Sequence, residues 1–328
     1  MRRSRCSALV LAGLIGAAPA ARAQSTPTVE GGAFLLLPIG ARATALGQAA
    51  VADGGTTEAL FWNPAGLAAV HHGEAALHYY SAFFGSGSAL VASVPAANLG
   101  TFTAAAYIVD YGDIDLTLPG GQGPPVGRVS PRNIALYASY ATELAGGVAA
   151  GITYKLVQFR VDCSGSCGNI PTAVGTTHAV DIGVQWAMPG GIPLVVGAAV
   201  RNLGFKLQVN NEAQADPLPT RLAIGVAWEL VRPAGDTDRI DVRVLADLQG
   251  SLGPGGVSPQ PLVGLESGVR DLVRIRVGYA FLEGSARGPS LGVGFKLGRA
   301  ALDLAKTFFA ADAIGEKEPV HLSFRLAL

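Results

Sequence analysis

The stretch Leu272-Val-Arg-Ile-Arg-Val-Gly-Tyr-Ala-Phe281 indicates the fold of this chain. Large apolar side chains stand at every second position from Val273 to Phe281, and the positions between them hold arginine, glycine or alanine. A period of two is typical of a β-strand that has one face against apolar surroundings. The same alternation appears in 219–230 and in 319–328. We therefore predict a chain built mainly from such strands.

The overall composition favours a membrane protein that has no spanning helix. Only 15% of the residues are charged, and the mean hydropathy is +0.36. Beyond the N-terminus, no segment offers the ~20 uninterrupted apolar residues that a membrane helix needs. A transmembrane β-barrel combines these properties, because one face of every strand contacts lipid. The formal net charge of +0 gives no attraction for nucleic acid, so we expect no nucleic-acid partner.

Residues 1–23 have the organisation of a signal peptide. Three arginines, at positions 2, 3 and 5, precede an apolar run from Ala8 to Ala18, and Ala21-Arg-Ala23 supplies the small residues of a cleavage site. Cleavage removes four arginines and no acidic residue, which leaves 20 basic and 24 acidic residues and a net charge of −4. We therefore expect an exported protein that reaches the outer membrane.

The alternation in 73–328 predicts fourteen strands, an even number as in bacterial single-chain barrels. They are placed at 74–82, 86–95, 99–110, 131–142, 147–161, 178–187, 192–205, 219–230, 238–250, 261–269, 272–282, 290–297, 300–309 and 319–328. Short connections alternate with long ones, which include 111–130, 162–177 and 206–218. Outer-membrane barrels sort their loops in this way, with tight periplasmic turns and longer external loops. The predicted fold is thus all-β, a transmembrane antiparallel β-barrel of about 14 strands.

The segment 24–72 differs from the strands, and we predict that it forms a small helical plug in the barrel lumen. Its residues 41–52 are rich in alanine and lack the alternation. Asn63 suits a helix cap because its side chain accepts backbone N–H groups, and Pro64 has the φ angle of a first helical residue. Small lumen-facing residues give a plug room, and we assign that role to Gly183, Gly225, Gly264, Gly268, Gly292 and Gly294.

Motifs at both ends of the chain point to a known family. The N-terminal motifs are Gly40-Ala-Arg-Ala43 and Asn63-Pro-Ala-Gly-Leu67, and the C-terminal ones include Arg276-Val-Gly-Tyr279 and Gly292-Val-Gly-Phe295. The chain resembles the PorV/PorQ family of outer-membrane barrels, which is related to the FadL long-chain fatty-acid transporters. The resemblance covers most of the chain after the leader. It implies a fourteen-strand barrel with the N-terminal segment folded into the lumen.

The resemblance implies two functions, and both stay open at this point. PorV-like members take part in type IX secretion, where they receive cargo at the outer membrane and pass it on for surface attachment. The external loops would then contact secretion-system components or secreted cargo. FadL relatives form channels for hydrophobic small molecules, which would bind in an apolar pocket between the plug and the upper lumen. Outer-membrane lipid surrounds the barrel in either case.

The candidate site residues lie in the plug and on the lumen face of the wall. Plug packing or ligand contact is predicted for Arg42, Phe61, Trp62, Asn63, Pro64, Ala65, Gly66 and Leu67. The alternation directs a set of charges into the lumen: Asp181, Arg221, Glu229, Asp241, Arg243, Asp247, Glu266, Arg274, Arg276, Lys296 and Arg325. Mixed signs on facing strands predict ion pairs between plug and wall, with Arg42 docked against one of the acids.

The remaining chemistry is sparse. Cys163 and Cys167 lie in a predicted external loop, where an oxidising compartment favours a disulfide between them. The five histidines suggest no nucleophile and base pair. His321 and Ser323 stand two apart on one strand face, ~7 Å from each other, which is too far for a direct hydrogen bond. We therefore expect no enzymatic activity, no cofactor and no metal.

Overall fold

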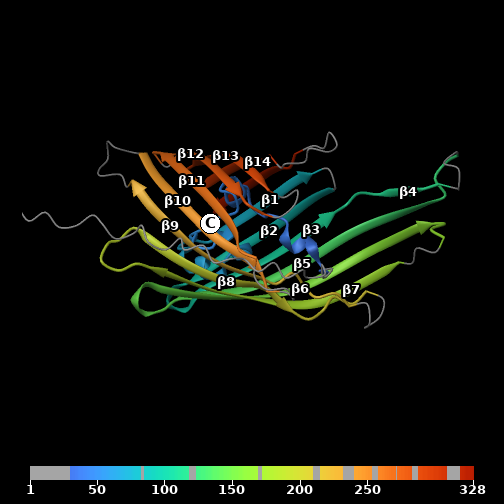
Figure 1. Cartoon of the computed structure of the whole chain (residues 1–328), viewed down its shortest axis with the longest axis horizontal. Helices are drawn as coiled ribbons and strands as arrows, with labels where there is room; N and C mark the ends of the chain where they lie inside the picture. The colour runs from blue at the N-terminus through green and yellow to red at the C-terminus, as the bar shows by residue number, and fades with distance from the viewer. Residues whose placement is uncertain are drawn as a thin grey trace, which may run out of the picture.

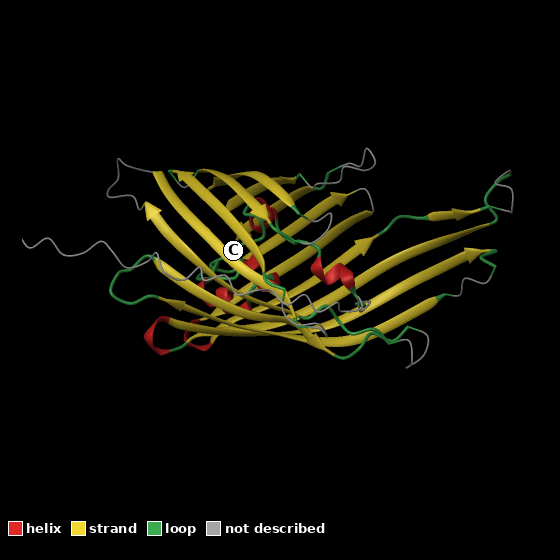
Figure 2. Ribbon diagram, in the orientation of Figure 1, coloured by secondary structure: helices red, strands yellow, loops and turns green. Residues whose placement is uncertain are grey.

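The computed structural model describes residues 30–82, 85–117, 123–168, 172–209, 215–231, 240–252, 258–270, 272–282, 287–308 and 318–328. The predicted signal peptide, 1–23, lies outside the described residues. Strands wrap around a lumen, and short helices lie inside it (Figure 1, Figure 2). None of the described helices has the length and the apolar character needed to cross a membrane.

The described residues contain fifteen strands in one antiparallel sheet. Their bounds are β1 Glu74–Ala82, β2 Gly85–Ala96, β3 Gly100–Asp110, β4 Ile114–Leu116, β5 Gly127–Glu143, β6 Val148–Gly165, β7 Ala173–Ala187, β8 Leu194–Gly204, β9 Arg221–Val231, β10 Ile240–Ser251, β11 Gln260–Val269, β12 Val273–Ala280, β13 Gly288–Leu297, β14 Ala300–Thr307 and β15 Val320–Ala327. The predicted strands coincide with these apart from shifts at their ends and the added β4.

The sheet closes because both of its edges find a partner. β15 pairs with β1, and β3 pairs with β5 along the whole of 101–110. β4 pairs with β5 beyond the end of β3, so it continues β3 along the same neighbour. The wall therefore has 14 strands, and the predicted antiparallel barrel is confirmed. We call the end with the tight turns, such as Gly298-Arg299 between β13 and β14, the inner end.

A proline explains the interruption between β3 and β4. The pairing of β3 ends at Asp110↔Arg132, and that of β4 starts at Ile114↔Val129. Pro131 has no N–H group to donate to the ladder, and prolines in sheets are confined to edges and bulges. Tyr111 stays attached through a hydrogen bond from its N–H group to the Pro131 carbonyl, at 3.3 Å. The chain thus bulges here and then resumes pairing.

The two faces of the wall differ as the alternation predicts. In β12, Ile275 and Val277 are exposed on the outside, whereas Arg276 between them is buried in the lumen. Trp186 and Trp228 also face outward, near the inner ends of β7 and β9, where an interfacial aromatic girdle is expected. Monomeric soluble proteins rarely expose large continuous apolar surfaces. The apolar outer face therefore fits contact with lipid.

The predicted external loops at 111–130 and 162–177 are partly wrong, because β5 to β7 are longer than expected. β5 begins at Gly127, β6 ends at Gly165 and β7 begins at Ala173. These strands and β4 extend past the rest of the outer rim, at the right of Figure 1. Proline, serine and glycine in these stretches read as turns, but pairing with neighbouring strands satisfies their backbone groups instead. We call β4 and the outer parts of β5 to β7 the extension.

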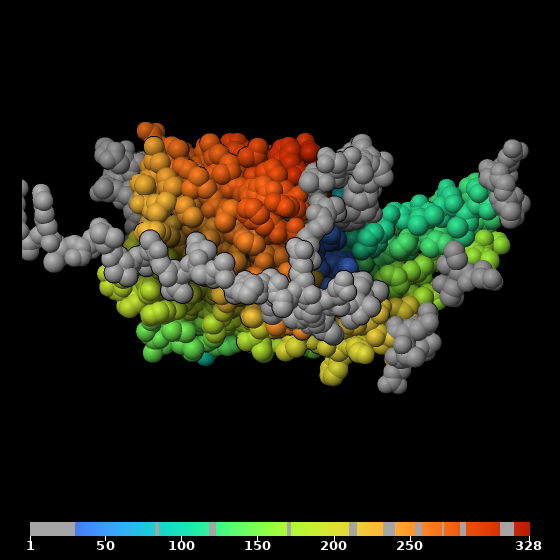
Figure 3. All heavy atoms as spheres, viewed as in Figure 1, coloured from blue at the N-terminus to red at the C-terminus, as the bar shows by residue number. Residues whose placement is uncertain are grey.

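The plug consists of four short helices inside the barrel: η1 Ala33–Leu36, α1 Ala41–Ala45, η2 Thr57–Phe61 and η3 Pro64–Ala69. Two further 3₁₀ turns, η4 Ala97–Leu99 and η5 Ala145–Gly147, form connections between strands. α1 packs against β12 to β15, and η3 packs against β5 to β7. In Figure 3 the blue atoms of the plug are visible between the orange strands and the green extension.

Wall glycines give the plug room, as expected from the sequence. A side chain at Gly183 would collide with Asn63, one at Gly264 with Leu46, and one at Gly292 with Ala45. The other three predicted glycines make space for wall residues instead, since Gly225, Gly268 and Gly294 adjoin the carboxylates of Asp247, Asp241 and Asp303, in that order. The small residues thus serve both the plug and the lumen charges.

Candidate functional site

Asn63 is the main neutral anchor of the plug. Its side-chain oxygen accepts the Ala65 N–H group at 3.1 Å, so it caps η3, and Pro64 is the first helical residue. Its side-chain nitrogen donates to the carbonyls of Val51 (2.7 Å) and Val184 (3.1 Å), which join two plug segments to β7. Because Asn63 is fully buried and all its polar atoms are engaged, the geometry supports capping and anchoring over ligand contact.

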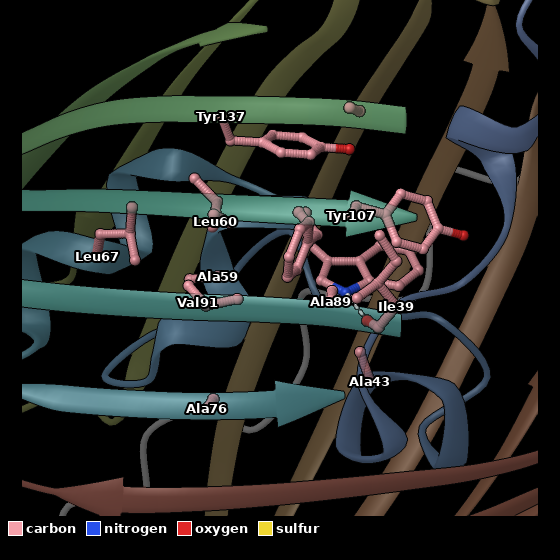
Figure 4. Packing of buried hydrophobic residues seen from close by; sticks show 14 of the residues in the cluster. Ile39, Ala43, Ala59, Leu60, Leu67, Ala76, Ala89, Val91, Tyr107 and Tyr137 are labelled. Carbon is pink, nitrogen blue, oxygen red and sulfur yellow. Dashed lines mark hydrogen bonds between the residues drawn. The ribbon is translucent and has the colours of Figure 1, made fainter. Parts of the chain in front are cut away.

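Aromatic and aliphatic side chains pack the plug against the wall. Figure 4 shows Leu60 and Ile39 of the plug near Tyr137 and Tyr107 of the wall, with Leu67 farther along the strands. Phe61, predicted as a site residue, meets the Tyr137 ring edge-on at a centroid distance of 5.4 Å. Pro64, Ala65 and Gly66 lie fully buried, where a side chain at Gly151 would strike Pro64 and Ala65. These residues form a packed core.

A narrow space remains between the plug and the wall, and we call it the outer crevice. It is lined by Leu35, Leu36, Leu37, Ile39, Phe61, Trp62, Tyr137, Lys155, Arg201 and Asn202. Its volume of about 10 Å³ gives room for about one water molecule. The η1 leucines are partly exposed, so the crevice begins at the accessible surface of the plug. Most of its lining residues are aliphatic or aromatic, and the others are Lys155, Arg201 and Asn202.

Two cations, Lys155 and Arg201, and the amide of Asn202 form the polar part of the outer crevice. Lys155 is ion-paired with Asp181 at 2.6 Å, and both are almost fully buried. Arg201 donates to the Phe61 carbonyl at 3.1 Å and to Gln249 at 2.8 Å. Its Nε group is buried and has no hydrogen-bond partner among the described residues. The crevice thus places two cationic side chains among leucine, isoleucine and aromatic residues.

A second space of about 10 Å³, the inner hollow, lies between segments of the plug. It is lined by Ala43, Ala50, Asp53, Gly54, Thr56, Glu58, Ala59 and Trp62. Glu58 accepts the Ala43 N–H group at 2.7 Å with one oxygen, and its other oxygen has no hydrogen-bond partner among the described residues. Burial raises the pKa of Glu58 to about 7. The hollow therefore holds a carboxyl group that changes charge near neutral pH.

Ion pairs join the inner side of the plug to the wall, as the sequence predicts. Arg42 contacts Asp53 within the plug and Glu266 of β11 at 3.1 Å. The wall arginines Arg243 and Arg276 complete these pairs, since Arg243 contacts Asp53 and Arg276 contacts Glu266, each at 2.5 Å. The pairs continue around the lumen as Arg276–Asp303 (2.6 Å), Arg325–Asp303 (2.9 Å) and Arg274–Asp241 (2.6 Å). We call this set the ion-pair network.

A large cavity, the vestibule, opens below the ion-pair network at the inner end. Its volume is about 1010 Å³. Its charged lining comprises the cations Arg42, Arg243, Arg270, Arg274, Arg276, Lys296, Arg299 and Arg325, and the anions Glu74, Glu229, Asp241, Glu266 and Asp303. Eight positive and five negative groups face the same space. The vestibule therefore carries an excess of positive charge.

The remaining predicted lumen charges occupy separate places. Arg221 lies near the outer end, paired with Glu30 at 2.7 Å. Asp247 accepts the N–H groups of Ala50 and Val51, so it anchors the plug rather than a wall arginine. The sequence reasoning missed Lys155 and Arg201, although their inward positions in β6 and β8 follow the same alternation. It also missed the acids of the plug, for which the sequence offers no periodic signal.

The predicted cysteine pair lies in the extension. The structure joins Cys163 and Cys167 by a disulfide close to the outer end of β6. It is distant in sequence from the plug and lines none of the three spaces. Among the described residues there is no group of three or more histidine, cysteine or acidic side chains that could hold a metal ion.

Comparisons with known proteins support the architecture. No family model and no curated protein matches the chain. The toluene transporter TodX of P. putida superposes with a TM-score of 0.60 and 12% identity, over 88% of this chain and 98% of that one. The toluene transporter TbuX of Ralstonia pickettii gives 0.57 and 12%, over 90% and 100%. A FadL homologue from Pseudomonas aeruginosa gives 0.50 and 12%, over 92% and 99%.

At such low identity these matches establish the fold alone, which is that of the FadL-like barrels. None of these proteins is described as a PorV/PorQ member. The resemblance to that family therefore stays a prediction.

Proposed function

We propose that this protein is an outer-membrane channel that admits hydrophobic small molecules. The observation that carries the proposal is the outer crevice, where leucine, isoleucine and aromatic side chains surround the cations Lys155 and Arg201. Sites for small organic ligands are usually apolar with a few oriented polar groups. The FadL-like fold and the lipid-facing outer wall agree with this role. The proposal gives the chain no catalytic step, cofactor or metal.

The plug determines when such a channel conducts. The outer crevice has room for about one water molecule, so a hydrocarbon can enter only if the plug side chains around it rearrange. Apolar contacts hold that part of the plug, and they can be exchanged for contacts with an apolar solute at little cost. A solute of this class would therefore replace the side-chain packing that it disturbs.

Uptake by bacterial cells tests the proposal. Cells that carry the chain should accumulate a radiolabelled aromatic hydrocarbon or a radiolabelled long-chain fatty acid faster than cells without it. Leu36→Arg places a charge in the outer crevice and should abolish the difference. Ala33→Arg is the matched control, because Ala33 lies exposed in the same helix and does not line the crevice. Equal uptake with and without the chain, for both probes, would count against the proposal.

Handling of secreted proteins is the second candidate. It follows from the resemblance to PorV-like members, and the structural comparisons do not support it. The observation in its favour is the extension, which presents strands and the exposed ion pair Arg128–Asp115 beyond the barrel rim. A protein partner would contact these strands and their charges. Affinity purification with the tagged full chain tests this role, and recovery of no exported or secretion-system protein would eliminate it.

A further inference from the structure

Three spaces follow one another through the plug, from its outer surface to the inner end. The outer crevice and the inner hollow share Trp62 as a lining residue. The inner hollow and the vestibule share Gly54 and Thr56. A residue that lines two spaces is the partition between them. The three spaces therefore form one column that is interrupted at two points.

Trp62 forms the outer partition. Its side chain is 4% exposed, and its indole N–H group donates to the Ile39 carbonyl at 3.1 Å. The guanidinium group of Arg201 lies over the ring, 5.1 Å from its centre. A cation over an aromatic face is attracted to it, so these contacts hold the ring in one orientation across the column. Rotation or removal of the ring would connect the two spaces.

The inner partition is much thinner. It consists of Gly54 and Thr56, which lie in the loop between α1 and η2 and carry no bulky side chain. This loop is held by a hydrogen bond from the Gly55 N–H group to Gly66 and by one from Gln185 of β7 to the Asp53 carbonyl, at 3.0 and 2.8 Å. The ion pairs of Asp53 with Arg42 and Arg243 hold the same loop, so it must shift against them to join the inner hollow to the vestibule. Trp62 is the bulkier of the two partitions.

The wall provides no comparable route in the part of the chain that the structure describes. Each pair of neighbouring wall strands is joined by a ladder, including the closing pairs β1–β15 and β3–β5. Register shifts occur at Val180/Ile182 between β7 and β8, and at Val242/Arg243 between β9 and β10. Pairing resumes on both sides of each shift, and Asp181 at the first one is fully buried by its ion pair with Lys155.

We infer that solutes cross this protein along the column through the plug, and that Trp62 is the gate of this route. The inference rests on the proposed channel function and adds the route and the residue that controls it. In the closed state the indole separates the crevice from the hollow. In the open state the ring leaves Ile39 and Arg201, and the solute passes the Thr56 loop into the vestibule.

Thiol labelling tests the outer partition directly. Ala59→Cys introduces a thiol into the inner hollow, and the native Cys163 and Cys167 are joined in a disulfide. A membrane-impermeant thiol reagent added outside intact cells should not label Ala59→Cys alone. It should label Ala59→Cys/Trp62→Ala. The matched control is Ala59→Cys/Leu67→Ala, because Leu67 is an equally buried plug residue that lines none of the three spaces.

Conductance in planar lipid bilayers tests the whole column. Trp62→Ala/Thr56→Gly removes both partitions and should produce a steady potassium chloride conductance that the wild-type barrel lacks. Leu67→Ala/Thr56→Gly should stay closed. Conductance or labelling that is the same with Leu67→Ala as with Trp62→Ala would overturn the inference, because any loosening of the plug would then be enough. The inference would also be overturned if the Trp62 variants showed neither conductance nor thiol labelling.

Folding and function are separated by two further measurements. Heat-modifiable migration of the barrel in gels reports folding, and if Trp62→Ala does not fold, Trp62→Leu is tested in the same assays. If the wild type takes up a probe but the Trp62 variants show no conductance, the route through the plug is wrong and the proposed channel function still holds. If the Trp62 variants conduct but the wild type takes up neither the hydrocarbon nor the fatty acid, the route is supported and the proposed channel function is not.

Discussion

The two ends of the lumen are built from opposite chemistry. At the outer end, the plug meets the wall through leucines and aromatic rings, and the space between them is about 10 Å³. At the inner end, plug and wall meet through the ion-pair network, and the vestibule below it measures about 1010 Å³. Apolar contacts are non-directional and exchangeable, whereas buried ion pairs require their partners. The outer end is therefore suited to admit a solute, and the inner end to hold the plug.

This difference also bears on the nature of the solute. A hydrophobic molecule that leaves the plug enters a chamber whose lining carries eight cationic and five anionic side chains. Charged side chains keep their hydration, so such a molecule buries less apolar surface there than in a packed apolar site. The vestibule thus favours release, while the outer crevice favours capture. The difference between the two ends favours inward movement of a hydrophobic solute, and only the plug has to move.

The largest effect is expected from breaking the network at the inner end. Glu266→Gln leaves Arg42 and Arg276 without their shared carboxylate. Removing one partner of a buried ion pair typically costs about 3–5 kcal/mol, so the free energy of unfolding in detergent should fall by that amount. The control is Asp115→Asn, since Asp115 pairs with Arg128 at an exposed site, where a pair contributes about 0–1 kcal/mol. Similar losses in both variants would contradict the assigned role of the inner end.

A pH effect is expected from Glu58, between the two ends. Its pKa in the folded plug is raised from 4.5 to about 7 by burial. Because the folded-state pKa lies above the unfolded one, the contribution to plug docking is fully present below about pH 4.5 and is lost as the pH rises towards 7. The shift corresponds to a contribution of about 3 kcal/mol. Amide hydrogen exchange in 41–61 should therefore show weaker protection at about pH 8 than at about pH 5.

Replacement by glutamine is the control for this effect. Glu58→Gln keeps the shape of the side chain and cannot ionise, so protection of 41–61 should lose its dependence on pH. A dependence that persists unchanged in Glu58→Gln would assign it to another group.

A smaller effect is expected at the neutral anchor. Asn63→Ala removes the cap of η3 and the hydrogen bonds to the carbonyls of Val51 and Val184, although Gln185 still donates to the Val51 carbonyl. Loss of a helix cap costs about 0.5–2 kcal/mol, so the midpoint of thermal unfolding should fall modestly. Asn63→Ser keeps an oxygen for the cap and should lose less than Asn63→Ala. Neither loss should depend strongly on salt, and a strong dependence would show that charge matters at this anchor too.

The smallest effect on stability is expected at the mouth of the vestibule. Arg270 and Arg299 lie at its rim in exposed turns, where substitutions usually change stability by less than about 0.5 kcal/mol. Their charges should nevertheless act on ions that pass. In the open variant Trp62→Ala/Thr56→Gly, the added changes Arg270→Gln and Arg299→Gln should lower the preference for chloride over potassium. Reversal potentials in a salt gradient measure this, and an unchanged preference would remove the vestibule from the conducting path.

Much of the architecture could be predicted because it depends on local periodicity. The alternation at Val273 to Phe281 placed Arg276 inside and Ile275 outside, and the structure agrees. Asn63 followed by Pro64 correctly predicted a capped helix start. The length of β5 to β7 escaped prediction, because Pro131 and the Ser-Gly-Ser run at 164–166 resemble turn signals in isolation. Their pairing depends on neighbours elsewhere in the chain.

The sequence predicted which residues face the lumen better than it predicted which of them contact one another. The alternation named most of the lumen charges, and Lys155 and Arg201 could have been added by the same rule. It could not reveal that Arg42 meets Glu266, which is 224 residues away in sequence. Nor could it show that Trp62 borders two separate spaces, because a space exists only once plug and wall are packed together.

The sequence by itself determined that this chain forms strands with a lipid face and a lumen face, and that an N-terminal segment of another character accompanies them. Both are properties of residues close together in the chain. The tertiary structure alone decided that the outer end closes by apolar packing, that the inner end closes by ion pairs, and that Trp62 stands between two spaces. Those features depend on contacts between residues far apart in sequence, whose partners are chosen only when the barrel closes around the plug.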